Sequence, residues 1–80
     1  MDDRAIHGHI EALVAEEHRL YDGASSGKLD DAQRARLASV QVELDRYFDL
    51  LRQRRAREEF GQDTDAAKLR AEGTVENYLQ

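Results

Sequence analysis

The sequence DDAQRARLASVQVELDRYFDLLRQRRAREEF (residues 30–60) has apolar residues at the spacing of one face of a helix. Asp30 is followed three residues later by Gln33, a pair typical of the capping box that begins a helix. No glycine or proline interrupts the stretch before Gly61. These features predict one helix over about 30–60, roughly 45 Å long. Its predicted core stripe consists of Leu37, Val40, Leu44, Tyr47, Phe48 and Leu51.

A shorter amphipathic stretch precedes this helix and predicts another helix over about 3–22. The glycines and serines of residues 23–27 predict a tight connector, so the two helices should lie antiparallel. Folding the chain at the connector places Leu13 opposite Val40 and leaves residues 52–60 projecting beyond the first helix. The predicted core stripe of the first helix consists of Ile6, Ile10, Leu13 and Leu20.

Residues 61–80 are polar and carry few apolar anchors, which predicts a polar, partly helical tail. The chain should therefore divide into a helical hairpin at 1–60 and a C-terminal tail at 61–80. A hairpin alone leaves half of each apolar stripe exposed, so a third layer must cover it. Either the tail folds back or two hairpins pair into a four-helix bundle, and the heptad spacing of both stripes favours this homodimer.

The composition excludes several classes of protein. Eighty residues allow one small domain, with 36% charged residues and a net charge of −5. The absence of cysteine excludes a disulfide scaffold, a thiol nucleophile and a thiolate metal site. No apolar run approaches the roughly 20 residues of a membrane span, and the acidic N-terminus is unlike a signal peptide, so secretion is not expected. No phosphate loop or serine-nucleophile motif occurs, so we expect neither an enzyme nor a cofactor.

Glu16, Glu17 and His18 form the group that most resembles a metal site of a helical bundle. Such sites use Glu-x-x-His, because residues three apart share a helix face, and this spacing does not occur here. A solvated polar face is therefore the favoured interpretation. Glu17 also falls on the apolar seam, where it either pins the register by pairing with Arg34, Arg36 or a second protomer, or reaches water at a frayed seam. We favour the frayed seam.

Residues 51–60 hold the one dense basic run, with four arginines against two glutamates. Arginine and tyrosine are enriched at binding hot spots. The predicted partner contacts are Arg52, Arg54, Arg55, Arg57 and Tyr78. The same guanidiniums suit phosphate, although the acidic flanks argue against nucleic acid. Tyr47 and Phe48 are adjacent, so one should face the first helix and the other a second surface.

Four segments of the chain stand out together: Leu13-Val14-Ala15-Glu16-Glu17-His18-Arg19-Leu20, Leu44-Asp45, Asp49-Leu50-Leu51-Arg52-Gln53-Arg54-Arg55-Ala56, and Val75-Glu76 with Tyr78. Their order and spacing resemble a family of short, uncharacterised actinobacterial proteins, the domain of unknown function 2630. The resemblance covers nearly the whole chain and is most specific over residues 49–56. The chain departs from the family at Phe48, where tryptophan is frequent, and in having no proline in its tail. The resemblance implies a cytoplasmic bacterial protein and brings no known activity, cofactor or catalytic residue.

The sequence thus predicts an all-α hairpin with a polar tail, paired as a homodimer. Its leading predicted function is that of a small, non-catalytic, cytoplasmic protein–protein interaction module. One alternative is a nucleic-acid or ribosome-associated factor that uses the arginines, and another is a metal-binding bundle at residues 16–18.

Overall fold

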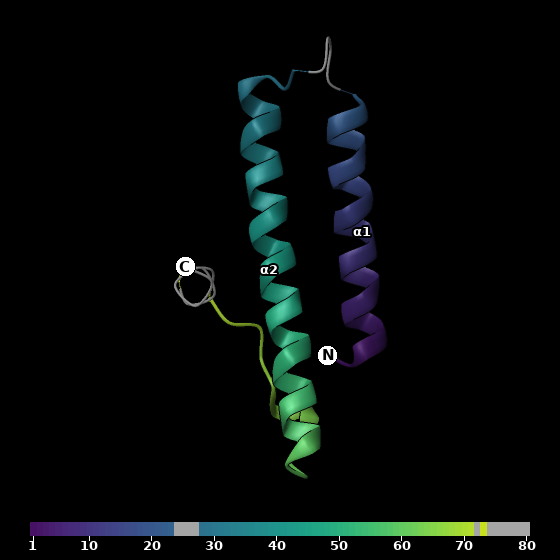
Figure 1. Ribbon diagram of the computed structural model, residues 1–80, viewed down its shortest axis with the longest axis vertical. Helices are drawn as coiled ribbons and strands as arrows, with labels where there is room; N and C mark the ends of the chain where they lie inside the picture. The colour runs from purple at the N-terminus through teal and green to yellow at the C-terminus, as the bar shows by residue number, and fades with distance from the viewer. Residues whose placement is uncertain (24–27, 72, 74–80) are drawn as a thin grey trace.

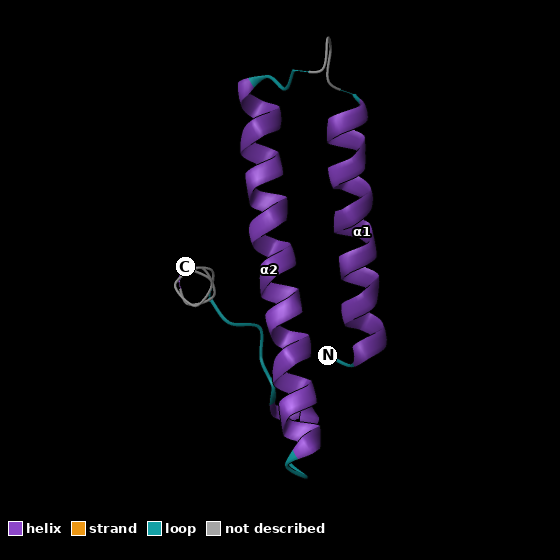
Figure 2. Ribbon diagram, viewed as in Figure 1, coloured by secondary structure: helices purple, strands orange, loops and turns teal. Residues whose placement is uncertain are grey.

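The computed structural model describes residues 1–23, 28–71 and 73, and these residues contain helices and loops but no strand (Figure 1, Figure 2). Helix α1 spans Asp3–Asp22 and helix α2 spans Asp31–Glu59. The two helices lie side by side and antiparallel (Figure 1). A short 3₁₀ turn, η2, follows at Thr64–Ala66. The predicted all-α hairpin is confirmed, and both helices begin and end within about one residue of the expected positions.

Local hydrogen bonds set the ends of the helices. An Asp2 carboxylate oxygen accepts from the backbone N–H of Ala5 at 2.8 Å, which caps α1. Asp30 and Gln33 form the predicted capping box of α2, with backbone-to-side-chain distances of 2.7 and 2.8 Å. Gly61 follows α2 with a φ of 66°, a left-handed conformation that glycine adopts without strain and that ends the helix.

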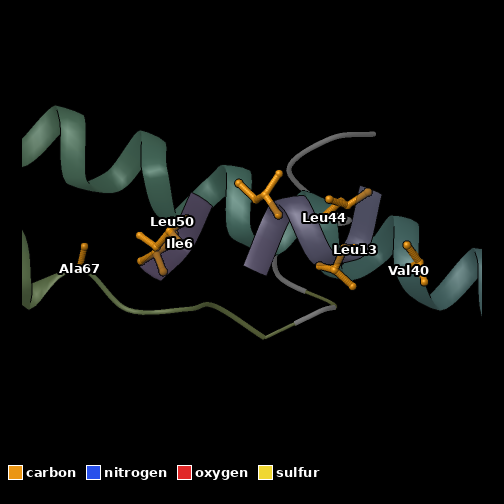
Figure 3. Close-up of a cluster of buried hydrophobic side chains, with 7 residues drawn as sticks. Ile6, Leu13, Val40, Leu44, Leu50 and Ala67 are labelled. Carbon is orange, nitrogen blue, oxygen red and sulfur yellow. The ribbon is translucent and has the colours of Figure 1, made fainter. Parts of the chain in front are cut away.

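The core lies between the facing stripes of α1 and α2 (Figure 3). Ile6 of α1 and Val40 of α2 are both 0% exposed. The buried cluster consists of Ile6, Ile10, Leu13, Val40, Leu44, Leu50 and Ala67. Of the other stripe residues, Leu37 is buried, and Leu20, Tyr47 and Leu51 are half-buried. Burial of these side chains stabilises the pairing of the helices, by about 1.5–3 kcal/mol for each large side chain that is fully buried.

The chain after α2 runs along the outer side of that helix, away from α1 (Figure 1). We call residues 62–71 the strap. Ala67 of the strap is buried in the same cluster as Leu50, which is 2% exposed. Leu50 lies off the stripe that faces α1, so the sequence pattern left it out of the predicted core. Val75, Tyr78 and Leu79, the apolar residues of the predicted tail, lie outside the described residues.

Phe48 differs from the expectation that it belongs to the core, because its side chain is 42% exposed. One residue along a helix turns the side chain by about 100°. Phe48 is therefore rotated away from its neighbour Tyr47, which packs against the core. Of the two adjacent aromatic residues, Tyr47 faces the helix pair and Phe48 faces outward.

Replacing Leu50 with alanine tests the contribution of the strap to the core. Leu50→Ala should lower the free energy of unfolding by about 2–5 kcal/mol, because it opens a cavity between α2 and the strap. Urea denaturation followed by circular dichroism measures the change. Phe60→Ala is the control, since Phe60 is 77% exposed and its loss should cost less than about 0.5 kcal/mol. Equal effects of the two substitutions would contradict the buried position of Leu50.

Candidate interaction surface

One face of the hairpin is marked by contacts between the two helices. Glu16 of α1 accepts two hydrogen bonds from the Arg36 guanidinium of α2, of which the one from Nη2 is 2.7 Å long. Seven residues before Glu16, His9 stacks on Tyr47 with ring centroids 4.9 Å apart. We call this the paired face of the hairpin.

The opposite face follows from helix geometry. Moving one residue along either helix turns the side chain by about 100°. Glu17 follows Glu16 on α1, and Phe48 follows Tyr47 on α2. Because the helices are antiparallel, this rotation carries Glu17 and Phe48 away from the paired face in the same direction, toward the opposite face of the hairpin. Helical spacing adds further residues of both helices to this face, Asp45 three residues before Phe48 among them. We define the open face by six of its residues: Val14, Glu17, Tyr21, Phe48, Arg52 and Arg55.

The open face combines apolar, basic and acidic side chains. Tyr21, Phe48, Arg52 and Arg55 are exposed, and Val14 and Glu17 are half-buried. The described part of the strap contacts the outer side of α2 and leaves this face uncovered. In Figure 1, which is viewed down the shortest axis of the molecule, the two helices form a single layer.

Arg54, one of the predicted partner contacts, binds two segments of its own chain through its guanidinium. Its Nε donates to Asp3 at 2.6 Å, and its Nη1 donates to the Thr64 carbonyl at 3.1 Å and to Asp65 at 3.2 Å. The residue is only 9% exposed. The hydrogen bond to Asp3, followed by the one to Asp65, raises the pKa of Arg54 above its ordinary value. We call this set of contacts the Arg54 latch; Arg54 lies in the part of α2 predicted to project beyond α1, and its long side chain reaches back to Asp3 at the start of α1.

Long polar side chains on the outer side of α2 hold the strap. Arg46 Nε donates to the Arg70 carbonyl at 2.9 Å, and Gln53 Nε2 donates to the Lys68 carbonyl at 2.8 Å. Asp49 accepts from Gln53 at 2.8 Å and lies 3.6 Å from Arg70 Nε. Sequence analysis missed these residues; the one available signal was their spacing on a single side of the helix.

Three of the four predicted arginine contacts remain available for binding. Arg52 and Arg55 are exposed and Arg57 is half-buried, and none of the three forms an ion pair with any residue in the described ranges. A polar hollow of about 410 Å³ lies beside Arg55, between the start of α1 and the end of α2. It is lined by Asp3, His7, Leu51, Arg54, Arg55, Glu58 and Thr64. Tyr78, the fifth predicted contact, falls outside the described residues.

Glu16, Glu17 and His18 do not converge on one site. The Glu16 carboxylate is held by Arg36, and this hydrogen bond lowers the pKa of Glu16. Glu17 is half-buried and has no hydrogen bond or ion pair with a described residue, while His18 is exposed. Across residues 1–23, 28–71 and 73, no three or more His, Asp or Glu side chains gather where a metal ion could bind. Glu16, rather than Glu17, is thus the carboxylate that pairs with α2.

Comparison with known proteins places the chain in a family. The model of a family described as proteins of unknown function, DUF2630, matches residues 2–80. The chain belongs to this family. It is similar to an uncharacterized protein of Mycobacterium tuberculosis (strain ATCC 25618 / H37Rv) and to one of Mycobacterium bovis. Each is 39% identical over 71 residues, which are 88% of this chain and 82% of the relative. No solved structure matches the chain.

No helix in the described part of the chain is both long enough and apolar enough to cross a bilayer.

The Arg54 latch predicts that the strap loosens when the guanidinium is removed. Arg54→Ala leaves Asp3 and Asp65 without their shared cation. We expect amide hydrogen exchange in residues 64–70 to accelerate by about tenfold or more, because these amides then open locally. Exchange measured by mass spectrometry tests this, with Arg52→Ala as the control from the same helix end. Unchanged protection of the strap would contradict a role for Arg54 in holding it.

The Glu16–Arg36 pair predicts a pH dependence of stability. The pKa of Glu16 is below its ordinary value of 4.5 in the folded protein, so its ionised form stabilises the fold above that pH. This contribution is lost as the pH falls through the lowered pKa. Glu16→Gln should therefore destabilise the protein at pH 7, and the difference from wild type should shrink below about pH 4.5. Urea denaturation from pH 7 to pH 3 measures the difference in the free energy of unfolding between wild type and variant. Glu11→Gln is the control, because Glu11 is exposed. A difference that stays constant with pH would contradict a stabilising role for the Glu16–Arg36 pair.

Proposed function

We propose that this protein is a small, non-catalytic, cytoplasmic interaction module that binds protein through the open face of its hairpin. The single observation that carries the proposal is the environment of Phe48. This aromatic side chain is 42% exposed, and the guanidiniums of Arg52 and Arg55, four and seven residues later, have no ion-pair partner in the described chain. One side of α2 therefore presents an aromatic ring and two available cations.

The composition of this surface supports protein as the ligand. Aromatic residues and arginine are enriched at the centres of protein interfaces, where they contribute most of the binding energy. An apolar edge on α1, formed by Val14 and Tyr21, extends the surface across the hairpin. The absence of a gathered group of His, Asp or Glu side chains within the described ranges supports binding rather than metal-dependent catalysis.

The charges also support protein over nucleic acid. The Arg54 latch removes one of the four arginines from any external contact. The remaining cations are accompanied by Glu58 and Glu59, both exposed, at the same end of α2. A phosphate-binding face is usually basic throughout. Three guanidiniums beside two carboxylates suit a protein surface of mixed charge better.

The homodimer favoured by the heptad spacing is one use of this face. A second hairpin on the open face would supply the third and fourth helices of a bundle and cover the exposed side of the core. Any other protein partner would compete for the same residues. A second copy of the chain and another protein partner would then compete for the open face.

A photo-crosslinking amino acid in place of Phe48 tests whether this face meets protein. We expect covalent protein adducts in an actinobacterial host, because Phe48 lies at the centre of the proposed surface. The double substitution Arg52→Ala and Arg55→Ala should lower the adduct yield by about fivefold or more, the effect of losing hot-spot contacts. The same crosslinker at Ala15, exposed on α1 and outside the open face, is the matched control. Position 48 giving no more adduct than position 15 would overturn the proposed function.

A further inference from the structure

The strap runs beside the last turns of α2 (Figure 1), and a hollow of about 200 Å³ lies between them. Four of its lining residues are three or four positions apart at the end of α2, so they form one stripe, and the other two belong to the strap. The backbone N–H of Gln62 donates to the Arg57 carbonyl at 2.7 Å, which holds the start of the strap beside this stripe. We call this the strap hollow, and it is lined by Gln53, Ala56, Arg57, Phe60, Gln62 and Arg70.

The charges around the strap hollow favour an anionic ligand. Among the described residues no carboxylate lines it, although the chain carries 17 acidic residues and a net charge of −5. One residue turns a helical side chain by about 100°, so Glu58 and Glu59 lie about 100° or more around α2 from the middle of the stripe. The larger hollow beside Arg55 is different, because Asp3 and Glu58 line it together with arginines.

Arg57 is the cation of this hollow that lacks an acceptor within the described chain. The residue is half-buried, and its guanidinium has no hydrogen bond or ion pair with a described residue. Arg70 adds a second guanidinium from the strap, and its charge is offset in part by Asp49, 3.6 Å from its Nε. A half-buried cation without a counter-charge is unfavourable, because burial removes water from it. A bound oxyanion would remove this cost, and the five N–H donors of a guanidinium suit the oxygens of a phosphate.

Phe60 adds an aromatic ring to the same hollow. It follows Arg57 by three residues and is 77% exposed, so its ring is open to stacking by a flat ligand. Gln62 is exposed, and its side-chain amide has no hydrogen bond within the described residues, so it can donate to and accept from the edge of a heterocycle. An aromatic ring beside a guanidinium is the combination with which proteins hold single nucleotides, since the base stacks and the phosphate binds the cation.

We propose that the strap hollow binds a nucleoside monophosphate, with the phosphate at Arg57 and Arg70 and the base stacked on Phe60. Its volume is below the roughly 300–1,000 Å³ of sites that enclose a drug-sized ligand. It therefore suits one phosphate and the adjoining sugar, with the base lying over Phe60 at the rim, rather than a dinucleotide. A single phosphate also needs no continuous basic face, unlike a nucleic-acid chain.

This site is separate from the open face. The middle of the stripe lies about 120° around α2 from the side that carries Phe48, Arg52 and Arg55. No residue belongs to both surfaces. The inference therefore goes beyond the proposed function and is tested independently of it.

Titration of the isotope-labelled full chain with adenosine monophosphate tests the proposal by nuclear magnetic resonance. We expect saturable shifts of the backbone amides of residues 56–62 and of the Arg57 Nε–H, with a dissociation constant of about 1 mM or lower. Two fragments of this ligand divide its contacts. Adenosine lacks the phosphate and inorganic phosphate lacks the base, so each should bind about tenfold or more weakly than the nucleotide.

Two variants assign the contacts to residues. Arg57→Gln should weaken binding of the nucleotide by about tenfold or more, because it removes hydrogen bonds to a charged group. Phe60→Ala should weaken it by about fivefold or more, because it removes the stacking partner of the base. Arg55→Gln and Phe48→Ala are the matched controls, since they change an exposed arginine and an exposed aromatic residue of α2 outside the hollow, and both should leave the affinity unchanged. Circular dichroism confirms that each variant is folded.

The outcomes decide between the nucleotide and other ligands. Loss of affinity in Arg57→Gln and Phe60→Ala, but not in their controls, supports the proposal. Failure of the nucleotide to saturate the shifts overturns it, as does equal binding by adenosine or by inorganic phosphate, or an equal loss in Arg55→Gln. Tighter binding of phosphotyrosine than of adenosine monophosphate would also overturn it, in favour of a phosphorylated peptide. None of these results affects the proposed function, which the crosslinker at position 48 tests on a different side of α2.

Discussion

Two helices can bury only the stripes that face each other, and this limit governs the whole molecule. The core of the hairpin is a single row of side chains from each helix, in which Ile6 and Val40 are the most completely buried. Four sides of the helix pair then need covering, namely the two faces of the hairpin and the outer side of each helix. A chain of 80 residues has few residues left for this purpose. The described residues outside the helix pair cover only part of this surface. Among the described residues, the strap covers the outer side of α2, side-chain contacts close the paired face, and the open face stays uncovered.

The strap and the Arg54 latch show how polar side chains can extend a small core. Arg46 and Gln53 donate to backbone carbonyls of the strap, so they hold it without requiring apolar side chains from it. Ala67 can then be the sole strap residue buried fully, against Leu50. Arg54 binds α1 and η2 at once, which joins the start of the first helix to the chain that follows the second. A hairpin whose far ends would otherwise fray is closed by one guanidinium.

The sequence predicts those features that depend on residues close together in the chain. The helix ends follow from Asp30, Gln33 and Gly61, and the facing stripes follow from the spacing of leucines and isoleucines. Contacts between residues that lie far apart in the sequence are not predicted in this way. Arg54 finds Asp3, 51 residues away, and no local pattern marks that pair.

For some contacts the sequence narrows the choice to two or three neighbouring residues, and the rotation and register of the two helices then decide among them. Glu16 and Glu17 are neighbours, and the choice between them as partner of Arg36 depends on a rotation of about 100° about the helix axis. The apolar pattern is too broad to fix this angle, because it admits Leu50, Leu51 and Phe48 almost equally. Packing of the strap against α2 decides among the three: Leu50 is buried, Leu51 is half-buried and Phe48 is exposed. The candidate surface therefore emerges from the tertiary structure, although each of its residues is visible in the sequence.

Binding and stability cannot be separate properties of such a protein. A face that the described residues leave uncovered lowers the stability of so small a core, and a ligand that binds this face only in the folded state raises the stability again. A partner present at a hundred times its dissociation constant would stabilise the fold by about 2.7 kcal/mol, a large fraction of what a domain of this size possesses. The exposed Phe48 and the half-buried Glu17 are then two aspects of one arrangement. Within the described residues, apolar and charged groups lack partners on the same side of the hairpin, and a complementary surface would satisfy both together.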